Sequence, residues 1–157
     1  MKKTIILAND ITELTPDFLR AQGVRAVLSD LDNTLAGYGA GVPDQAAGHW
    51  MAGIKSAGIS LFIISNAGKP RVSSFCDPLG LPYLARAKKP GAKGLLQALE
   101  RLGVSASEAV MVGDQYRTDI RAGWNAGIRV ILVPPRVKGF FFTLRRLLEE
   151  PFIRRRI

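Results

Sequence analysis

Two aspartates, Asp30 and Asp32, follow directly on the apolar stretch Val24 to Leu28. Because a strand alternates its side chains between two faces, carboxylates two residues apart can point the same way. Desolvated carboxylates need a cation or hydrogen-bond donors to hold them. Mg²⁺ with a phosphate suits them, since hard cations prefer oxygen ligands and substrate phosphates complete the shell. The spacing therefore predicts phosphoryl-transfer chemistry, although Asp-x-Asp-x-Thr is also typical of an N-cap or an Asx-turn.

A phosphoryl-transfer site needs a nucleophile, an acid for the leaving oxygen and positive charge around the phosphoryl oxygens. We expect Asp30 to attack phosphorus and form an aspartyl-phosphate, and Asp32 to act first as general acid and then as general base. We expect Lys89 to supply a fixed cation. Ser65 and the backbone N–H of Asn66 are expected to bind the phosphate, and Thr34 to orient the loop of the nucleophile. Mg²⁺ is expected to bind to Asp30, Asp114 and the backbone carbonyl of Asp32. Asp119 is expected to make a supporting contact to the metal or the lysine.

Each of these residues also has an interpretation without chemistry. The pair Ser65-Asn66 is compatible with a simple turn, and Lys89 with a solvated helix entry. Asp114 is compatible with a helix N-cap, followed by an exposed first turn that contains Asp119. The chemical interpretation is favoured because all of these positions follow predicted strands or begin predicted helices.

Strand-like apolar runs alternate with helix-like segments along the chain. The predicted strands are 25–30, 59–65, 82–85, 109–113 and 128–133, and the predicted helices are 43–57, 69–79, 91–102 and 116–125. This alternation, with continuously apolar strands, predicts an α/β fold in which helices cover both faces of a parallel sheet. Open sheets of this kind bind ligands beyond the carboxyl ends of their strands, where the candidate residues lie.

The composition predicts one soluble globular domain. At 157 residues the chain fits a single domain, and its 47% hydrophobic and 22% charged residues are ordinary for a soluble globular protein. The start resembles a signal peptide only briefly, because Asn9 and Asp10 interrupt it, and no apolar run approaches the roughly 18 residues that span a bilayer. Cys76 is the single cysteine, which excludes an intramolecular disulfide and favours the cytoplasm.

The net charge of +9 favours acidic partners. Seven basic and two acidic residues lie in the segment 136–157, where Phe140, Phe141 and Phe142 stand close to cations. Two interpretations stay open: a basic amphipathic segment on an anionic membrane, or a C-terminal helix that packs on the core with solvated arginines. Specific nucleic-acid binding is not expected, because no recognisable module or aromatic platform accompanies the charge.

Taken together, the motifs resemble those of the haloacid dehalogenase (HAD) superfamily of aspartate-nucleophile phosphatases. The segment Asp30-Leu31-Asp32-Asn33-Thr34 is similar to the first motif of that superfamily, Ser65 to the second, Lys89 to the third, and Gly113-Asp114 with Asp119 to the fourth. Finer details resemble the YqeG-like IIIA branch, which is related to the mitochondrial phosphatidylglycerophosphate phosphatases. These details are Ala87-Lys88-Lys89-Pro90, Gly113-Asp114-Gln115-Tyr116-Arg117-Thr118-Asp119 and the terminal arginine cluster.

This resemblance implies a three-layer Rossmann-like fold and Mg²⁺-dependent hydrolysis of a phosphomonoester through an aspartyl-phosphate. It points to a phosphorylated anionic lipid such as phosphatidylglycerophosphate, and to a cytoplasmic protein at the inner face of the membrane. The alternatives are a small soluble phosphate ester, or a non-catalytic phosphoacceptor or binding module. The chain departs from the branch at Ala67 and Trp124, where an asparagine is usual, and these departures bear on substrate contacts rather than on catalysis.

The spacing of the motifs predicts that no cap domain is present. Many relatives insert a cap after the first motif or between the second and third. Here 34 residues separate Asp30 from Ser65 and 23 separate Ser65 from Lys89, and a helix and a strand take up most of each interval. We therefore expect one capless domain over 1–157. An open site of this kind suits a large substrate that itself covers the site, because no lid excludes water.

Overall fold

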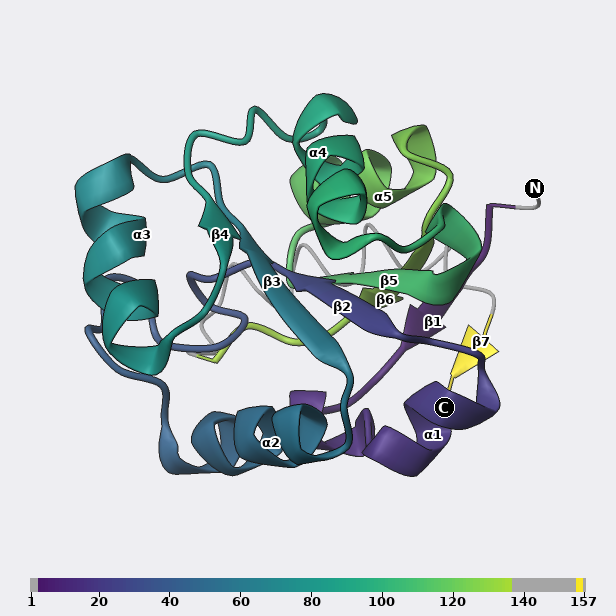
Figure 1. The fold of residues 1–157 in the computed structure, drawn as a ribbon, viewed down its shortest axis with the longest axis horizontal. Helices are drawn as coiled ribbons and strands as arrows, with labels where there is room; N and C mark the ends of the chain where they lie inside the picture. The colour runs from purple at the N-terminus through teal and green to yellow at the C-terminus, as the bar shows by residue number, and fades with distance from the viewer. Residues whose placement is uncertain (1–2, 137–154, 157) are drawn as a thin grey trace.

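A parallel sheet lies at the centre of the computed structural model, which describes residues 3–136 and 155–156 (Figure 1). The described residues form seven strands in the order β4-β3-β2-β5-β6-β1-β7, and every pairing is parallel. The strands are β1 (Ile5–Leu7), β2 (Ala26–Ser29), β3 (Ser60–Ile64), β4 (Tyr83–Leu84), β5 (Ala109–Gly113), β6 (Arg129–Leu132) and β7 (Arg155–Arg156). The predicted α/β class with a parallel sheet is confirmed.

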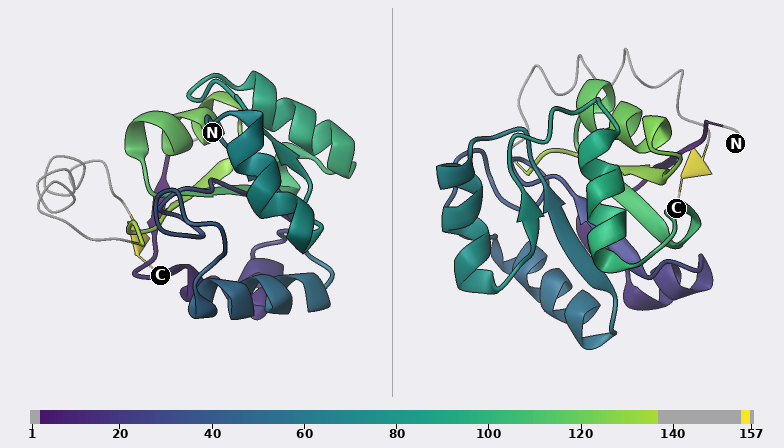
Figure 2. Two further views of the ribbon diagram at one scale, coloured as in Figure 1. Left: turned by 90° about the vertical axis from the view of Figure 1, so that its left-hand side faces the viewer. Right: turned by 45° about the horizontal axis from the view of Figure 1, so that its top comes forward.

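Helices connect the strands and cover both faces of the sheet. They are α1 (Pro16–Ala21), α2 (Gln45–Ser56), α3 (Lys69–Cys76), α4 (Lys93–Leu102) and α5 (Arg121–Asn125), with short 3₁₀ turns η1 (Ile11–Glu13), η2 (Asp77–Leu79) and η3 (Ala106–Glu108) and a π-helical turn η4 (Tyr116–Ile120). Figures 1 and 2 show α1 and α2 on one side of the sheet and α4 and α5 on the other.

The alternation of side chains along each strand divides the core into two layers. Leu28 of β2 lies in register with Phe62 of β3 and Met111 of β5, and these three pack with Leu95 of α4. Val27, one residue earlier, belongs to the opposite layer, which includes side chains of α1, α2 and α3. Because both faces are buried, the strands are continuously apolar, as a parallel sheet requires.

The predicted elements agree with the structure to within two residues at most of their ends. The helix predicted over 69–79 ends at Cys76 and continues as η2, where Pro78 lacks the N–H that an α-helix needs. The helix predicted over 116–125 begins as the wide turn η4 before α5. These changes leave the strand ends, and hence the candidate residues, where the sequence places them.

One prediction about the sheet is wrong. The sequence predicts the run 25–30 as the first strand, but β1 (Ile5–Leu7) precedes it and pairs with β6 and β7. This three-residue strand has too little periodicity to identify it locally, and its partner β6 lies more than a hundred residues later. The apolar start of the chain is therefore part of the sheet.

Only Arg136 and the backbone of β7 are described in the basic segment predicted over 136–157; the aromatic and arginine residues between them lie outside the described residues. Arg136 was counted with the charges of this segment, but its guanidinium is paired. It donates to both oxygens of Asp44 at 2.6 and 2.7 Å and to Asp10 Oδ2 at 2.9 Å, and its backbone N–H donates to Asn33 O at 2.8 Å. Arg136 thus joins the chain start, the N-cap of α2 and the loop beside Asp32.

No helix within residues 3–136 is both long and apolar enough to cross a membrane. This finding concerns the described residues alone.

Replacing Arg136 with alanine is expected to lower the free energy of unfolding by about 1–2 kcal/mol at pH 7, because two half-exposed carboxylates lose their partner. The Arg136 hydrogen bonds hold the pKa of Asp44 below its ordinary value. That stabilisation is present above the unfolded pKa of about 3.9 and is lost as the pH falls through the folded value. The difference between wild type and variant should therefore shrink in acid.

Urea unfolding at pH 7 and pH 3 measures this difference. Arg121→Ala is the matched control, since Arg121 is exposed at the start of α5 and should change stability by less than about 0.5 kcal/mol. Equal losses in the two variants at pH 7 would contradict the role of the Arg136 contacts.

Candidate active site

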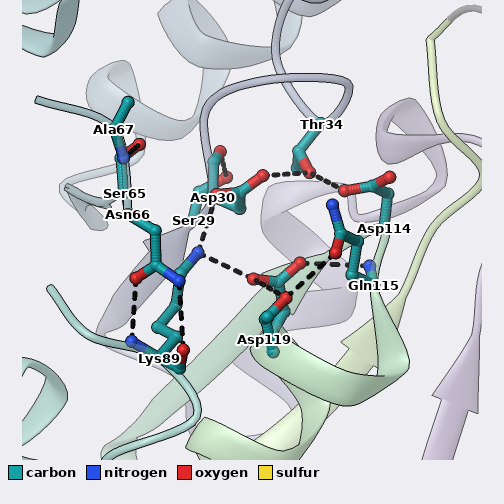
Figure 3. A network of polar contacts seen from close by, with 11 residues as sticks. Ser29, Asp30, Thr34, Ser65, Asn66, Ala67, Lys89, Asp114, Gln115 and Asp119 are labelled. Atoms are coloured by element: carbon teal, nitrogen blue, oxygen red, sulfur yellow. Dashed lines mark hydrogen bonds and ion pairs between the residues drawn. The ribbon is translucent and has the colours of Figure 1, made fainter. Parts of the chain in front are cut away.

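The loops that follow β2, β3 and β5 meet at one edge of the sheet, together with the loop between β4 and α4 (Figure 3). A cavity of about 220 Å³ lies there, and its lining includes Asp30, Asp32, Ser65, Asn66, Lys89 and Asp119. A larger apolar groove of about 500 Å³ between α2 and the start of β3 contains none of the candidate residues. The polar cavity is therefore the candidate site.

The Lys89 ammonium lies between two carboxylates at the floor of the site. Its Nζ is 2.7 Å from Asp30 Oδ1 and 2.7 Å from Asp119 Oδ1, and all three side chains are largely or fully buried. Burial by itself would lower the pKa of Lys89, but the charges of Asp30 and Asp119 outweigh it and raise that pKa above its ordinary value. The structure therefore places the Lys89 ammonium between two carboxylates, and its role as the fixed cation of the reaction stays a prediction.

The side chain of Asn66 holds the loop that carries Lys89. Its Nδ2 donates to Lys89 O at 3.0 Å, and its Oδ1 accepts from Lys89 N at 2.8 Å. Next to it, the Oγ of the buried Ser65 accepts from Ala67 N at 3.1 Å. The amide side chain is therefore occupied, and the phosphate donor predicted at this position is the backbone N–H.

Thr34 lies between the carboxylates of Asp30 and Asp114. Its Oγ1 is 3.3 Å from Asp30 Oδ2 and 3.4 Å from Asp114 Oδ1, and it is fully buried. The hydroxyl carries one proton, so it can donate to only one of the two carboxylates at a time. Thr34 therefore contacts both carboxylate-bearing loops, and its role in orienting the loop of Asp30 stays a prediction.

Three buried carboxylates meet at the site. Asp30, Asp114 and Asp119 each offer an oxygen within 4.8 Å of the other two. Burial, followed by the Asp119 charge, raises the pKa of Asp30 to about 6 against the opposing effect of Lys89. Carboxylate oxygens are the ligands that hard divalent cations take. The residues present therefore fit a metal.

The acidic cluster differs in one member from the predicted metal ligands. It contains Asp30 and Asp114 as expected, but its third carboxylate is Asp119, whereas the prediction assigned the third ligand to the Asp32 carbonyl. Asp119 accepts from Lys89 through Oδ1 and from Gln115 N at 3.0 Å through Oδ2. Both of its oxygens thus have donors, which agrees with the predicted supporting contact to the lysine.

Asp32 also lines the cavity but does not belong to the buried cluster, and 19% of its side chain is exposed. Its Oδ1 accepts from Arg71 Nη2 at 2.8 Å, from Arg71 Nε at 3.3 Å and from Gly39 N at 2.9 Å. The site residues predicted from the sequence do not include Arg71. A signal was available, because Arg71 lies in the first turn of the helix that begins four residues after Ser65, which places it at the same sheet edge.

A parallel α/β sheet that gathers two acidic loops and a buried lysine at one edge defines a hydrolase of the HAD-like class. The chain belongs to that family: the haloacid dehalogenase-like hydrolase profile matches residues 7–127. With its named relatives, this makes the chain a phosphatase that acts on a phosphate ester and has an acidic site suited to a metal.

The similar proteins agree with the predicted branch. The chain is 32% identical over 143 residues to the probable phosphatase YqeG of Bacillus subtilis, an alignment that covers 90% of this chain and 83% of the relative. It is 29% identical over 163 residues to phosphatidylglycerophosphate phosphatase 1, chloroplastic, of Chlamydomonas reinhardtii, covering 96% of this chain and 60% of that protein.

Solved structures support the fold. The cobalt-bound deoxy-D-mannose-octulosonate 8-phosphate phosphatase of Haemophilus influenzae superimposes with a TM-score of 0.56 at 15% identity, covering 82% of this chain and 89% of that one. At this level of identity the likeness concerns the fold alone.

Gly113, the last residue of β5, has no room for a side chain, because a Cβ there would collide with the Asp119 carboxyl group. Gly113→Ala is therefore expected to displace Asp119 from Lys89 and to lower kcat by at least about tenfold, since small misplacements at a reacting centre are costly. The measurement is steady-state hydrolysis of p-nitrophenyl phosphate.

Gly53→Ala is the control, because that helical glycine of α2 has open space around it. The variant should keep full activity and gain about 0.5–1 kcal/mol of stability. Full activity in Gly113→Ala would contradict this account.

Proposed function

We propose that the chain is a Mg²⁺-dependent phosphomonoester hydrolase with Asp30 as its nucleophile. The observation that carries this proposal is the gathering of three buried carboxylates, Asp30, Asp114 and Asp119, beside the Lys89 ammonium at the sheet edge. Carboxylate oxygens grouped in this way are the ligands that a hard cation such as Mg²⁺ takes, and a substrate phosphate can complete its shell. Asp30 and Asp114 would hold the metal with the Asp32 carbonyl, and bound Mg²⁺ supplies positive charge next to the transferred phosphoryl group.

In the proposed mechanism, a carboxylate oxygen of Asp30 attacks phosphorus and the bond to the leaving oxygen breaks. Asp32 donates its proton to that oxygen, and then accepts a proton from the water that hydrolyses the aspartyl-phosphate. Lys89 holds the attacking carboxylate in place through its 2.7 Å contact and offsets the charge of the phosphoryl oxygens. Ser65 and the backbone N–H of Asn66 bind those oxygens.

An anionic lipid phosphate is the substrate class that we propose. The name of the Chlamydomonas relative supports it, and so does a cationic rim around the cavity, which we define as Arg86, Lys88 and Arg117. All three residues are exposed. In the loops 65–71, 84–91 and 113–118 the one acidic residue is the buried Asp114, so the rim charges have no acidic neighbour in these loops.

Backbone contacts hold the rim close to the cavity. Arg86 N donates to Ala67 O at 2.9 Å, and Ala67 lines the cavity. Lys88 directly precedes the buried Lys89, and both Arg86 and Lys88 have positive φ angles, 49° and 55°. Exposed and buried residues alternate along this loop: Arg86 and Lys88 are exposed, and Ala87 and Lys89 are buried. These exposed cations would attract an anionic surface that approaches the cavity.

We further propose that the protein is one capless domain that works at the cytoplasmic face of a membrane, with peripheral contact through the basic segment 136–157. The intervals between the motifs support the first part, since α2 and β3 occupy one and α3, η2 and β4 the other. The charge of the segment supports the second part.

Loading the site with metal is expected to stabilise the fold as well as to permit turnover. Adding Mg²⁺ should raise the melting temperature of the wild type, with about 2.7 kcal/mol of stabilisation at a hundred times its Kd, and a chelator should reverse the shift. Asp114→Asn should remove most of the Mg²⁺-induced shift in melting temperature. Asp30→Asn should reduce turnover about 10³-fold or more, because an amide is no nucleophile. Glu100→Gln on the exposed face of α4 is the control. An unchanged response in Asp114→Asn would refute the metal assignment.

Turnover of lipid and small substrates should respond differently to the rim. The double variant Arg86→Ala/Lys88→Ala is expected to raise KM for phosphatidylglycerophosphate in mixed micelles about tenfold or more, at roughly 1 kcal/mol per basic residue. Turnover of p-nitrophenyl phosphate should change less than about twofold. Lys55→Ala/Arg101→Ala removes two exposed charges near the ends of α2 and α4, at the opposite edge of the sheet, and should have neither effect.

A panel of sugar and nucleotide phosphates completes this experiment. Asp30-dependent activity on small esters without lipid turnover would leave the phosphatase and remove the lipid. Flotation with anionic and zwitterionic vesicles tests the membrane contact, and absence from both would refute it.

A further inference from the structure

Arg71 connects the proposed general acid to the core of the protein. Its Nη2 and Nε lie 2.8 and 3.3 Å from Asp32 Oδ1, and the side chains of Arg71 and Asp32 are 21% and 19% exposed. Gly39 N, from the loop between β2 and α2, donates to the same oxygen at 2.9 Å. Three N–H donors from two separate segments therefore converge on one oxygen of Asp32.

The guanidinium of Arg71 is itself held in place. Its Cζ lies 5.7 Å from the centroid of the Phe75 ring, one helical turn further along α3. Phe75 is fully buried and packs in the core layer that also contains Val72 and Cys76 of the same helix. The position of the cation is therefore set by the packing of α3 before any substrate arrives.

This geometry decides which oxygen of Asp32 can carry a proton. A carboxylic acid holds its proton on one oxygen, and a proton on Oδ1 would face N–H groups that can only donate. The proton is thus confined to Oδ2, for which the described residues provide no hydrogen-bond partner. We infer that Arg71 is a positioning residue that keeps the transferable proton of Asp32 on Oδ2 and holds that oxygen available to the leaving group.

The inference rests on the proposed role of Asp32 as the general acid. In that step the bond between phosphorus and the leaving oxygen breaks, and the Oδ2 proton passes to that oxygen. Arg71 transfers no proton and keeps its charge throughout. Its contribution should therefore depend on how much the leaving group needs a proton, which distinguishes it from a residue that merely binds phosphate or stabilises the fold.

The test is a series of phosphate esters whose leaving groups range from 2,4-dinitrophenol through phenol to a simple alkanol. The measured quantity is kcat/KM, because it reports the steps up to departure of the leaving group and not the later hydrolysis of the intermediate. Arg71→Ala should lose about tenfold or more on alkyl esters and little on the dinitrophenyl ester, with a steeper dependence on leaving-group pKa. Asp32→Asn should show the same trend with a loss of about 10²–10⁴ on alkyl esters.

Further variants sharpen this test. Arg71→Lys restores one donor and the charge, so it should recover part of the alkyl-ester activity. Asp32→Asn/Arg71→Ala should be no worse than Asp32→Asn alone, because both changes act on the same proton transfer. Lys69→Ala is the matched control, since it removes an exposed cation from the same turn of α3 without touching Asp32. Thermal unfolding of each variant verifies that it is folded.

The outcomes separate the inference from the proposal on which it rests. Equal losses for all esters in Arg71→Ala, beside a steep dependence in Asp32→Asn, would overturn the role of Arg71 and leave Asp32 as the acid. A flat dependence in Asp32→Asn itself would overturn the acid role and this inference with it. Additive losses in the double variant would also overturn it.

Discussion

The buried contact of the Lys89 ammonium with Asp30 and Asp119 is the interaction on which the site depends. Removing the ammonium would leave two carboxylates buried without compensation, which is strongly destabilising in general. Much of the surrounding structure supports this contact. The Asn66 side chain, after the end of β3, makes two hydrogen bonds to the Lys89 backbone, and Gln115 N, after the end of β5, donates to Asp119. Three strands therefore contribute to the position of one nitrogen, and parallel strands make this possible because their carboxyl ends share one edge.

The carboxylate cluster around the Lys89 contact connects folding with the proposed chemistry. Asp114 adds a third carboxylate, with an oxygen within 4.8 Å of the other two. A cation bound to this cluster would stabilise the fold by mass action, so metal binding and folding of the site would be linked. The absence of space at Gly113 belongs to the same arrangement, because it allows Asp119 to approach the strand end closely.

The sequence predicts most of the fold and the buried side of the site, because both follow from local patterns. Apolar runs mark the strands, and Asp30, Ser65 and Asp114 follow those runs directly. The features that the sequence does not reveal depend on contacts between distant segments. Strand β1 is recognisable only beside β6, and Arg136 looks like a free charge until Asp10 and Asp44 are seen to surround it. The contact of Arg71 with Asp32 likewise requires the orientation of α3, which the core around Phe75 determines.

The two sides of the site are held in place by different structural elements, and this difference bears on how a phosphatase acquires its specificity. The side that would receive the phosphoryl group is buried and anchored to strand ends. The Asp32 side, which would face the leaving group, is held by Arg71 of α3 and by Gly39 in the loop before α2. Substitutions on helix turns and loops disturb the sheet less than substitutions at strand ends. The leaving-group side can therefore change while the chemistry at Asp30 and Lys89 is retained, and substrate identity is expected to reside in these outer residues.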